Sequence, residues 1–189
     1  MRVLMLEAPT ALLEQRARLG HDRWDEMWEG ILHMVPAPRS RHQEIVAWLA
    51  ELLRPLARTR GLIAHHEVNL HRPGRDDDYR IPDFAVWDVA VASERGVEGA
   101  ALTVVEVRSP EDESYEKIPW YLEVGVGEVV IVDRDTLTVE VFRSLDPSTG
   151  EPVLADDTTI TSLDVTLGRV SDDHLQIDLH DGSVRDITL

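Results

Sequence analysis

Cysteine is absent from this chain of 189 residues. Its absence excludes disulfide bonds, a thiolate nucleophile and any zinc site built on cysteine ligands. Long apolar runs are also absent, since no stretch approaches the roughly 18 apolar residues that suggest a membrane-spanning helix. The first fifteen residues lack the layout of a signal peptide. We therefore expect a cytoplasmic protein that makes no use of a membrane.

Lysine is almost absent as well, because a single lysine, Lys117, stands against 18 arginines. Such a ratio fits a compositional bias under which surface lysines drift to arginine. A lysine is then retained where its compact, deprotonatable ammonium does something that a guanidinium cannot do. Chance is the alternative explanation, and the ratio alone leaves both open.

Positive charge is scarce overall, and the net charge is −17. Residues 1–110 carry 14 arginines and 17 acidic residues, a balance of −3, whereas residues 111–189 carry five basic and 19 acidic residues, a balance of −14. A surface this acidic repels phosphate backbones. The composition therefore argues against a generic DNA-binding module, and any nucleic-acid contact is expected at a local site in the N-terminal part.

Periodicity along the chain predicts a mixed α/β protein. Residues 10–19 and 40–59 have helical spacing, with Ser40 and Gln43 in a capping-box pattern. Strands are expected at 31–34, 62–71, 79–90, 101–107, 128–133 and 138–143, and the apolar run at 101–107 is typical of a central, doubly covered strand. A helix is expected within 109–125, acidic at its start and ended by Gly125, and the acidic run 76–78 is expected in a solvated loop.

The length suits a single domain spanning 1–189. Within it we expect a core at 24–145 and a β-rich C-terminal extension at 146–189, where turn signals separate short polar segments.

Two carboxylates and the lone lysine form the pattern that carries chemistry. Asp83 follows Pro82, which cannot donate to a β-ladder and so suits the end of a strand. Glu106 lies inside an apolar strand, where an unpaired carboxylate is costly and has to be protonated, paired or bound to a metal. Two carboxylates on neighbouring strands can hold Mg²⁺ together with phosphate oxygens and water. Lys117 could orient a water or stabilise charge on a phosphate.

A purely structural interpretation of the same residues is also open. Asp83 could cap a turn, and Glu106 could form a buried ion pair with an arginine. Spacing alone does not choose between the two interpretations.

The wider frame resembles a known family. The segments WEGILHMVPAPRSRHQEIVAWLAELL, IPDFAVW, LTVVEVRSPEDESYEKIPWYLEVGVGEVVIVD and TVEVFR occur in this order between about residues 24 and 145. Together they resemble the Uma2 family, also called DUF820, of restriction-endonuclease-like proteins. The resemblance implies the PD-(D/E)xK nuclease fold, a mixed sheet of four or five strands flanked by helices, with a divalent metal, Mg²⁺ or Mn²⁺, at its edge.

The resemblance also implies roles for particular residues. Asp83 matches the Asp of the PD motif, and Glu106 matches the Glu of the EVxS motif, with the backbone carbonyl of Val107 as a further metal ligand. Lys117 matches the lysine of the family, which is displaced from the strand onto the following helix. Glu29 resembles an early acidic position that often completes the metal site.

Three further positions bear on that match. His42 resembles the His at the start of the long helix of the family. Arg108 occupies the place two residues after Glu106 where a standard PD-(D/E)xK site has its lysine. It could supply a fixed positive charge, although its high pKa makes it a poor base, or it could simply pair with an acid. Tyr121, at i+4 from Lys117, could position the lysine, but we expect it mainly to pack.

The function expected from this resemblance is Mg²⁺-dependent phosphodiester hydrolysis, acting on DNA or another nucleic acid. The alternative is a catalytically weak or inactive nuclease-fold protein that serves as a dimeric binding or regulatory module, as the acidic C-terminal part suggests. Nucleases of this fold often pair, so we expect a homodimer.

Overall fold

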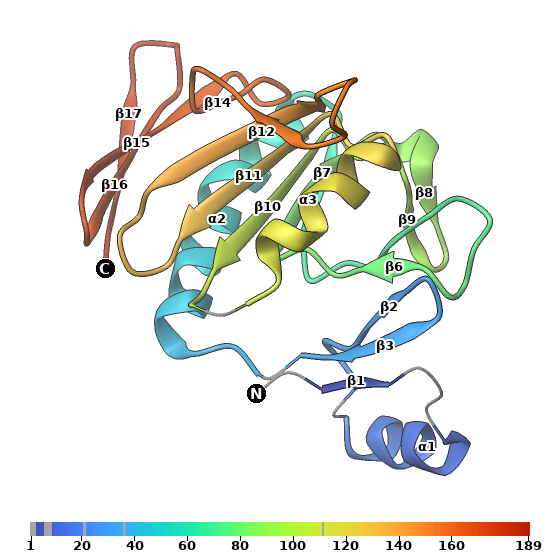
Figure 1. The fold of residues 1–189 in the computed structure, drawn as a ribbon. Helices are drawn as coiled ribbons and strands as arrows, with labels where there is room; N and C mark the ends of the chain where they lie inside the picture. The colour runs from blue at the N-terminus through green and yellow to red at the C-terminus, as the bar shows by residue number, and fades with distance from the viewer. Residues whose placement is uncertain (1–2, 6–8, 21, 36, 111) are drawn as a thin grey trace.

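A computed structural model describes residues 3–5, 9–20, 22–35, 37–110 and 112–189 as a mixed α/β fold with three sheets (Figure 1). The helices are α1 (Thr10–Leu19), α2 (Ser40–Thr59) and α3 (Ser114–Glu123), with a short 3-10 helix at Val89–Val91. No helix of the described residues is long and apolar enough to cross a membrane.

The central sheet has six strands in the order β13-β12-β11-β10-β7-β4. Strands β10 and β11 are parallel and the other pairs are antiparallel, so the sheet is mixed. Its strands are β4 (Ile63–His66), β7 (Phe84–Trp87), β10 (Thr103–Arg108), β11 (Glu128–Asp133), β12 (Val139–Leu145) and β13 (Pro152–Leu154).

Two smaller sheets flank the central one. The N-terminal sheet has the order β1-β3-β2-β6-β5-β9-β8, and the C-terminal sheet the order β14-β15-β16-β17. The strands of the first are β1 (Val3–Met5), β2 (Glu26–Trp28), β3 (Ile31–Met34), β5 (Leu70–His71), β6 (Tyr79–Arg80), β8 (Ala92–Ser93) and β9 (Gly96–Glu98). Those of the second are β14 (Thr159–Ile160), β15 (Val165–Ser171), β16 (His174–Asp178) and β17 (Val184–Thr188).

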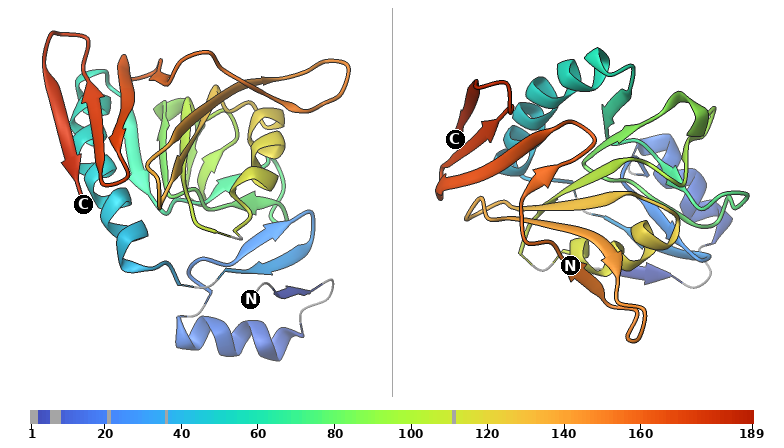
Figure 2. Two further views of the ribbon diagram at one scale, coloured as in Figure 1. Left: turned by 60° about the vertical axis from the view of Figure 1, so that its left-hand side comes forward. Right: turned by 90° about the horizontal axis from the view of Figure 1, so that it is seen from above.

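The two faces of the central sheet have different covers. Helix α2 and the C-terminal sheet pack on one face, and α3 packs on the other (Figure 2). Successive side chains of β10 alternate between these layers: Val105 and Val107 join the α2 core, and Val104 joins the α3 core. Glu106 therefore stands on the α3 face of a strand that is buried on both sides, as the apolar run at 101–107 predicted.

Several expected elements differ in the structure. The expected strand at 62–71 is divided into β4 and β5, which belong to different sheets, and Glu67 between them has a φ of 51°. The expected strand at 79–90 is likewise divided into β6 and β7, with Pro82 and Asp83 between them. The predicted capping box is wrong, because Arg39 is the N-cap of α2 and no side chain caps it.

Candidate active site

Asp83 and Glu106 lie on adjacent strands and on one face of the central sheet. Phe84 of β7 pairs with Val105 of β10 in an antiparallel register, which places Asp83 opposite Glu106. Directly opposite residues in a sheet project to the same side. The strand break at Pro82 leaves Asp83 just outside the ladder, and its side chain is 19% exposed.

Hydrogen bonds from two different elements fix the Asp83 carboxylate. The backbone amide of Val107 donates to Oδ2 at 2.7 Å, and Nε2 of His42, near the start of α2, lies 2.9 Å from Oδ1. Burial acts to lower the pKa of His42, but the hydrogen bond and charge of Asp83, together with the charges of Glu106 and Asp112, raise it above its usual value. His42 is thus held toward its charged form, facing the carboxylate.

Val107 presents its backbone to the same point. In an extended strand, the N–H and C=O of one residue face the same neighbouring strand, and successive residues alternate. The amide of Arg134 donates to the carbonyl of Arg108 on the β11 side, so the carbonyl of Val107 faces the Asp83 side, as its amide does. This backbone geometry suits the predicted role of the Val107 carbonyl as an oxygen ligand.

The lone lysine reaches Glu106 from α3. Nζ of Lys117 lies 3.2 Å from Oε1 of Glu106, and the hydroxyl of Tyr121, one helical turn later, donates to the same oxygen at 2.6 Å. The two residues share a helix face because they are four positions apart. Tyr121 is fully buried, yet it does more than pack, since it orients the carboxylate of Glu106.

A third carboxylate, that of Glu26 in β2, completes this buried cluster. Oε1 of Glu26 lies 2.8 Å from Nζ of Lys117, and the side chain is 1% exposed. The Ile81 amide donates to Oε1, and the Trp28 indole donates to Oε2, both at 2.8 Å. Lys117 therefore links two carboxylates that come from separate sheets.

The shared ammonium explains how these groups titrate. Burial raises the pKa of Glu106, and the charges of Asp83 and Glu26 raise it further against the opposing effect of Lys117, to about 8. Burial acts to lower the pKa of Lys117, but the charges of Glu106, Glu26 and Asp83 raise it overall. One ammonium between two buried carboxylates stays protonated, while Glu106 keeps a proton at neutral pH unless another cation neutralises it.

The guanidinium of Arg80 lies against two tryptophan rings, that of Trp28 in β2 and that of Trp120 in α3. Arg80 is 3% exposed, and its guanidinium carbon lies 4.2 Å from the ring centre of Trp28 and 4.3 Å from that of Trp120. Asp78 bonds to both Arg80 and Trp120 and is fully buried. The expectation of a solvated acidic loop at 76–78 is therefore wrong for Asp78, because Asp78 neutralises buried cations.

Glu29 does not reach the site, and Glu26 supplies the early carboxylate instead. Trp28 pairs with Ile31, so Glu29 and Gly30 form a two-residue hairpin turn, with φ of 50° and 89°. Positive φ at both positions is typical of the tight hairpin turn that matches strand twist. The Glu-Gly pair was a usable turn signal, but nothing in the sequence separated Glu26 from its acidic neighbours.

Arg108 also lies away from the carboxylate pair. It is in register with Asp133 on β11, and its guanidinium bonds to that carboxylate at 2.7 Å, with a side chain 35% exposed. The guanidinium carbon lies 5.3 Å from the ring centre of Tyr115. Arg108 thus takes the pairing role that was one of its two alternatives, and Lys117 is the cation that contacts Glu106.

These residues line a cleft of about 520 Å³. Glu26, His42, Asp83, Glu106 and Lys117 all face it, and the arginines at positions 39 and 134 lie along its walls. Among the described residues, no three or more His, Asp or Glu side chains are grouped so as to hold a metal ion. Two carboxylates with a backbone carbonyl, completed by water, nevertheless form an oxygen donor set suited to Mg²⁺. The carboxylate excess around Lys117 also favours a bound cation.

Comparison with known proteins identifies this arrangement. The Uma2 family model, described as "Putative restriction endonuclease", matches residues 13–175. The chain belongs to the Uma2 family. The family thus expected from the sequence motifs is confirmed, and the match includes every residue of the cleft named above.

Solved structures add to the assignment of the fold. A structure described as a "putative nuclease belonging to DUF820" from Anabaena variabilis is similar over 71% of this chain and 77% of its own, with 21% identity and a TM-score of 0.55. At this identity the likeness shows the fold, which confirms the expected nuclease-like α/β class. A DrdV–DNA complex is also similar, over 60% of this chain and 10% of its own, with 19% identity and a TM-score of 0.36. No curated protein sequence matches this chain.

Proposed function

We propose that this Uma2 protein is a divalent-metal-dependent nuclease that hydrolyses phosphodiester bonds in the cleft between β7, β10 and α3. The observation that supports this most directly is the juxtaposition of Asp83 and Glu106 across adjacent strands, with the protonated Lys117 in contact with Glu106. The family description, which is that of a restriction endonuclease, agrees with this chemistry.

Each residue has a role set by its surroundings. Asp83, Glu106 and the Val107 carbonyl would hold the metal, which when bound would polarise a phosphate oxygen and acidify a water. His42 and the Val107 amide keep the carboxylate of Asp83 in one orientation. Lys117 is held charged, so it would stabilise developing negative charge on the phosphate rather than act as a base. Tyr121 positions Glu106.

A second candidate function rests on the same contacts. Glu26 and Lys117 form a buried ion pair, and Lys117 also contacts Glu106, so these groups are satisfied without a metal. A protein in which these contacts are purely structural would be the inactive binding or regulatory module. Binding of Mn²⁺, measured by calorimetry, separates the two: Asp83-dependent binding supports the nuclease, and no binding at millimolar Mn²⁺ supports the module.

The decisive experiment compares two aspartates at opposite ends of β7. Purified wild type should cleave supercoiled plasmid or labelled oligonucleotides with Mg²⁺ or Mn²⁺, and Asp83→Asn should be slower by about a hundredfold or more. Asp88→Asn is the matched control, since Asp88 is exposed and its carboxylate accepts from the Ala90 amide at 2.8 Å, away from the cleft. Equal cleavage by wild type and Asp83→Asn would identify a contaminant and contradict the proposal.

The choice of Mg²⁺ as the physiological ion, a cytoplasmic location and a homodimer belong to the same proposal. Light scattering coupled to size-exclusion chromatography tests the dimer, and a mass equal to one chain of 21.4 kDa would contradict it.

A further inference from the structure

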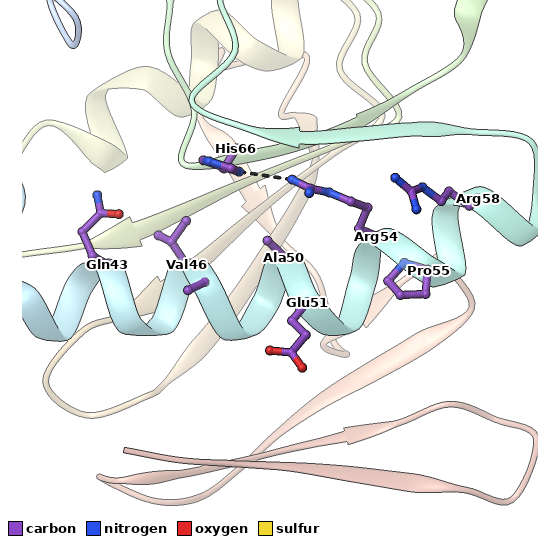
Figure 3. Close-up of a pocket in the computed structure, with 9 residues that line it drawn as sticks. Gln43, Val46, Ala50, Glu51, Arg54, Pro55, Arg58 and His66 are labelled. Carbon is purple, nitrogen blue, oxygen red and sulfur yellow. Dashed lines mark hydrogen bonds between the residues drawn. The ribbon is translucent and has the colours of Figure 1, made fainter.

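A groove along α2 begins where the cleft ends. It has a volume of about 380 Å³ and runs from Gln43 to Arg58, with His66 of β4 on its far wall (Figure 3). Gln43 directly follows His42 of the cleft, and its side chain lies 3.4 Å from Glu67, which lines the cleft. Fifteen residues of helix are about 22 Å long. The groove therefore extends the cleft along the outer edge of the central sheet.

Hydrogen-bond donors, two of them cationic, gather on one side of this groove. Arg54, Arg58 and Gln43 point to the side of α2 on which His66 lies, whereas Glu51 points away from it (Figure 3). An Nη atom of Arg54 lies 3.2 Å from Nδ1 of His66. Two arginines thus lie on the His66 side of the groove, whose lining has one carboxylate, that of Glu51, although the whole chain carries a charge of −17.

The two arginines are unusual for this chain. Most arginines of the described chain form an ion pair with a carboxylate, as Arg16 does with Asp25. Within the residues that the structure covers, neither Arg54 nor Arg58 has a carboxylate partner, and Nε of Arg54 is buried without a hydrogen-bond acceptor. A buried guanidinium donor left unpaired is costly unless an anion completes it. The buried, unpaired Nε of Arg54, with the exposed guanidinium of Arg58 in the same groove, indicates an anionic ligand.

We propose that this groove binds the phosphate backbone of the nucleic-acid strand that leaves the cleft, with Arg54 and Arg58 each contacting a phosphate. The inference rests on the proposed nuclease function and deepens it by placing the strand outside the cleft. At 3.4 Å per nucleotide, the groove spans about six nucleotides of one strand of a duplex. Strand β4 stands beside β7 at the end of the central sheet of the described chain, so this path follows an edge strand.

Salt-dependent binding tests the contacts without any need for catalysis. Fluorescence anisotropy with a labelled 20-nucleotide DNA, single-stranded and duplex, is measured in EDTA between 20 and 200 mM salt. Each phosphate contact adds about 0.9 to the slope of log affinity against log salt on duplex DNA and about 0.7 on a single strand. The double variant Arg54→Gln/Arg58→Gln should therefore bind between about 10-fold and 100-fold more weakly at 0.1 M salt. Its slope of log affinity against log salt on duplex DNA should be smaller in magnitude by about 2.

A control variant removes the same charge elsewhere. Arg18→Gln/Arg185→Gln neutralises two exposed arginines outside the groove and should bind as the wild type does. Equal affinity and slope for the two double variants would overturn the groove contacts, even where Mg²⁺-dependent cleavage persists. Absence of binding by the wild type to both DNAs at 20 mM salt would overturn them as well. Equal cleavage by wild type and Asp83→Asn contradicts the nuclease proposal separately.

The cysteine-free chain allows a direct footprint of the groove. Ala47 is exposed and lines it, so Ala47→Cys gives a unique thiol at the proposed strand path. Saturating DNA should slow maleimide alkylation of this thiol at least about tenfold, and Gln176→Cys on the acidic C-terminal sheet should react at an unchanged rate. Equal alkylation of Ala47→Cys with and without DNA would contradict the proposal. Slowing that grows with protein concentration in the absence of DNA would assign the groove to a second copy instead and also overturn it.

Discussion

Replacing Glu106 by glutamine should make the free energy of unfolding less dependent on pH. The pKa of Glu106 is raised to about 8 in the folded protein, chiefly by burial, against an ordinary value of 4.5. Between these two pH values the folded state holds a proton that the unfolded state has released. The free energy of unfolding must then fall as pH rises, by about 1.4 kcal/mol per pH unit. Over the whole window the loss is on the order of several kcal/mol.

Glutamine keeps the shape and the acceptor oxygen of Glu106 but does not titrate. It can still accept from Lys117 and Tyr121, so Glu106→Gln should fold. The free energy of unfolding, from urea titrations in EDTA between pH 5 and 8.5, should fall less steeply with pH in the variant than in the wild type. At pH 8 the variant should be the more stable protein by several kcal/mol, while its cleavage activity is lost.

The comparison isolates one carboxyl. His42 also has a raised pKa, and its stabilisation is present below its unfolded pKa and is lost as pH rises through the folded value. Most of this loss is common to both proteins, because the hydrogen bond and charge of Asp83 that chiefly raise the pKa of His42 are unchanged in the variant; only the smaller effect of the Glu106 charge differs. Glu44→Gln, an exposed carboxyl on α2, is the matched control and should follow the wild type. Parallel pH profiles for wild type and Glu106→Gln would refute the reasoning that Glu106 is a protonated, destabilising group.

Three further outcomes follow from the site. Glu26→Gln should lower the free energy of unfolding by about 1–3 kcal/mol, because one buried oxygen acceptor becomes an NH₂ donor. Glu29→Gln at the exposed turn should change it by less than about 0.5 kcal/mol. Urea unfolding of both variants checks this, and similar values for the two would contradict the placement of Glu26 and Glu29. Arg108→Gln should retain the cleavage rate within about threefold, since Arg108 pairs with Asp133 and its partly exposed ion pair is worth about 1 kcal/mol or less. A loss of cleavage rate as large as that of the Asp83 variant would place Arg108 in the active site. Lys117→Arg should keep the charge yet lose most cleavage, because the bulkier guanidinium does not fit an enclosed position 2.8 Å from Glu26. Cleavage at the wild-type rate would show that only the charge matters.

The sequence by itself determined the elements and the family. Helical spacing located α1 and α2, the apolar run located β10, and the ordered motifs identified the Uma2 frame, because local periodicity and motif order are properties of the chain alone. The motifs also selected Asp83, Glu106 and Lys117, which the fold brings into one cleft.

Only the tertiary structure decided which other groups meet there. Glu26 reaches Lys117 from another sheet, and the choice between Glu26 and Glu29 depends on a hairpin turn whose strands must first pair. The sequence left open whether Arg108 or Lys117 meets the carboxylates, and strand register places Asp133 beside Arg108. Such contacts join residues far apart along the chain, and packing and register, rather than local propensity, fix them.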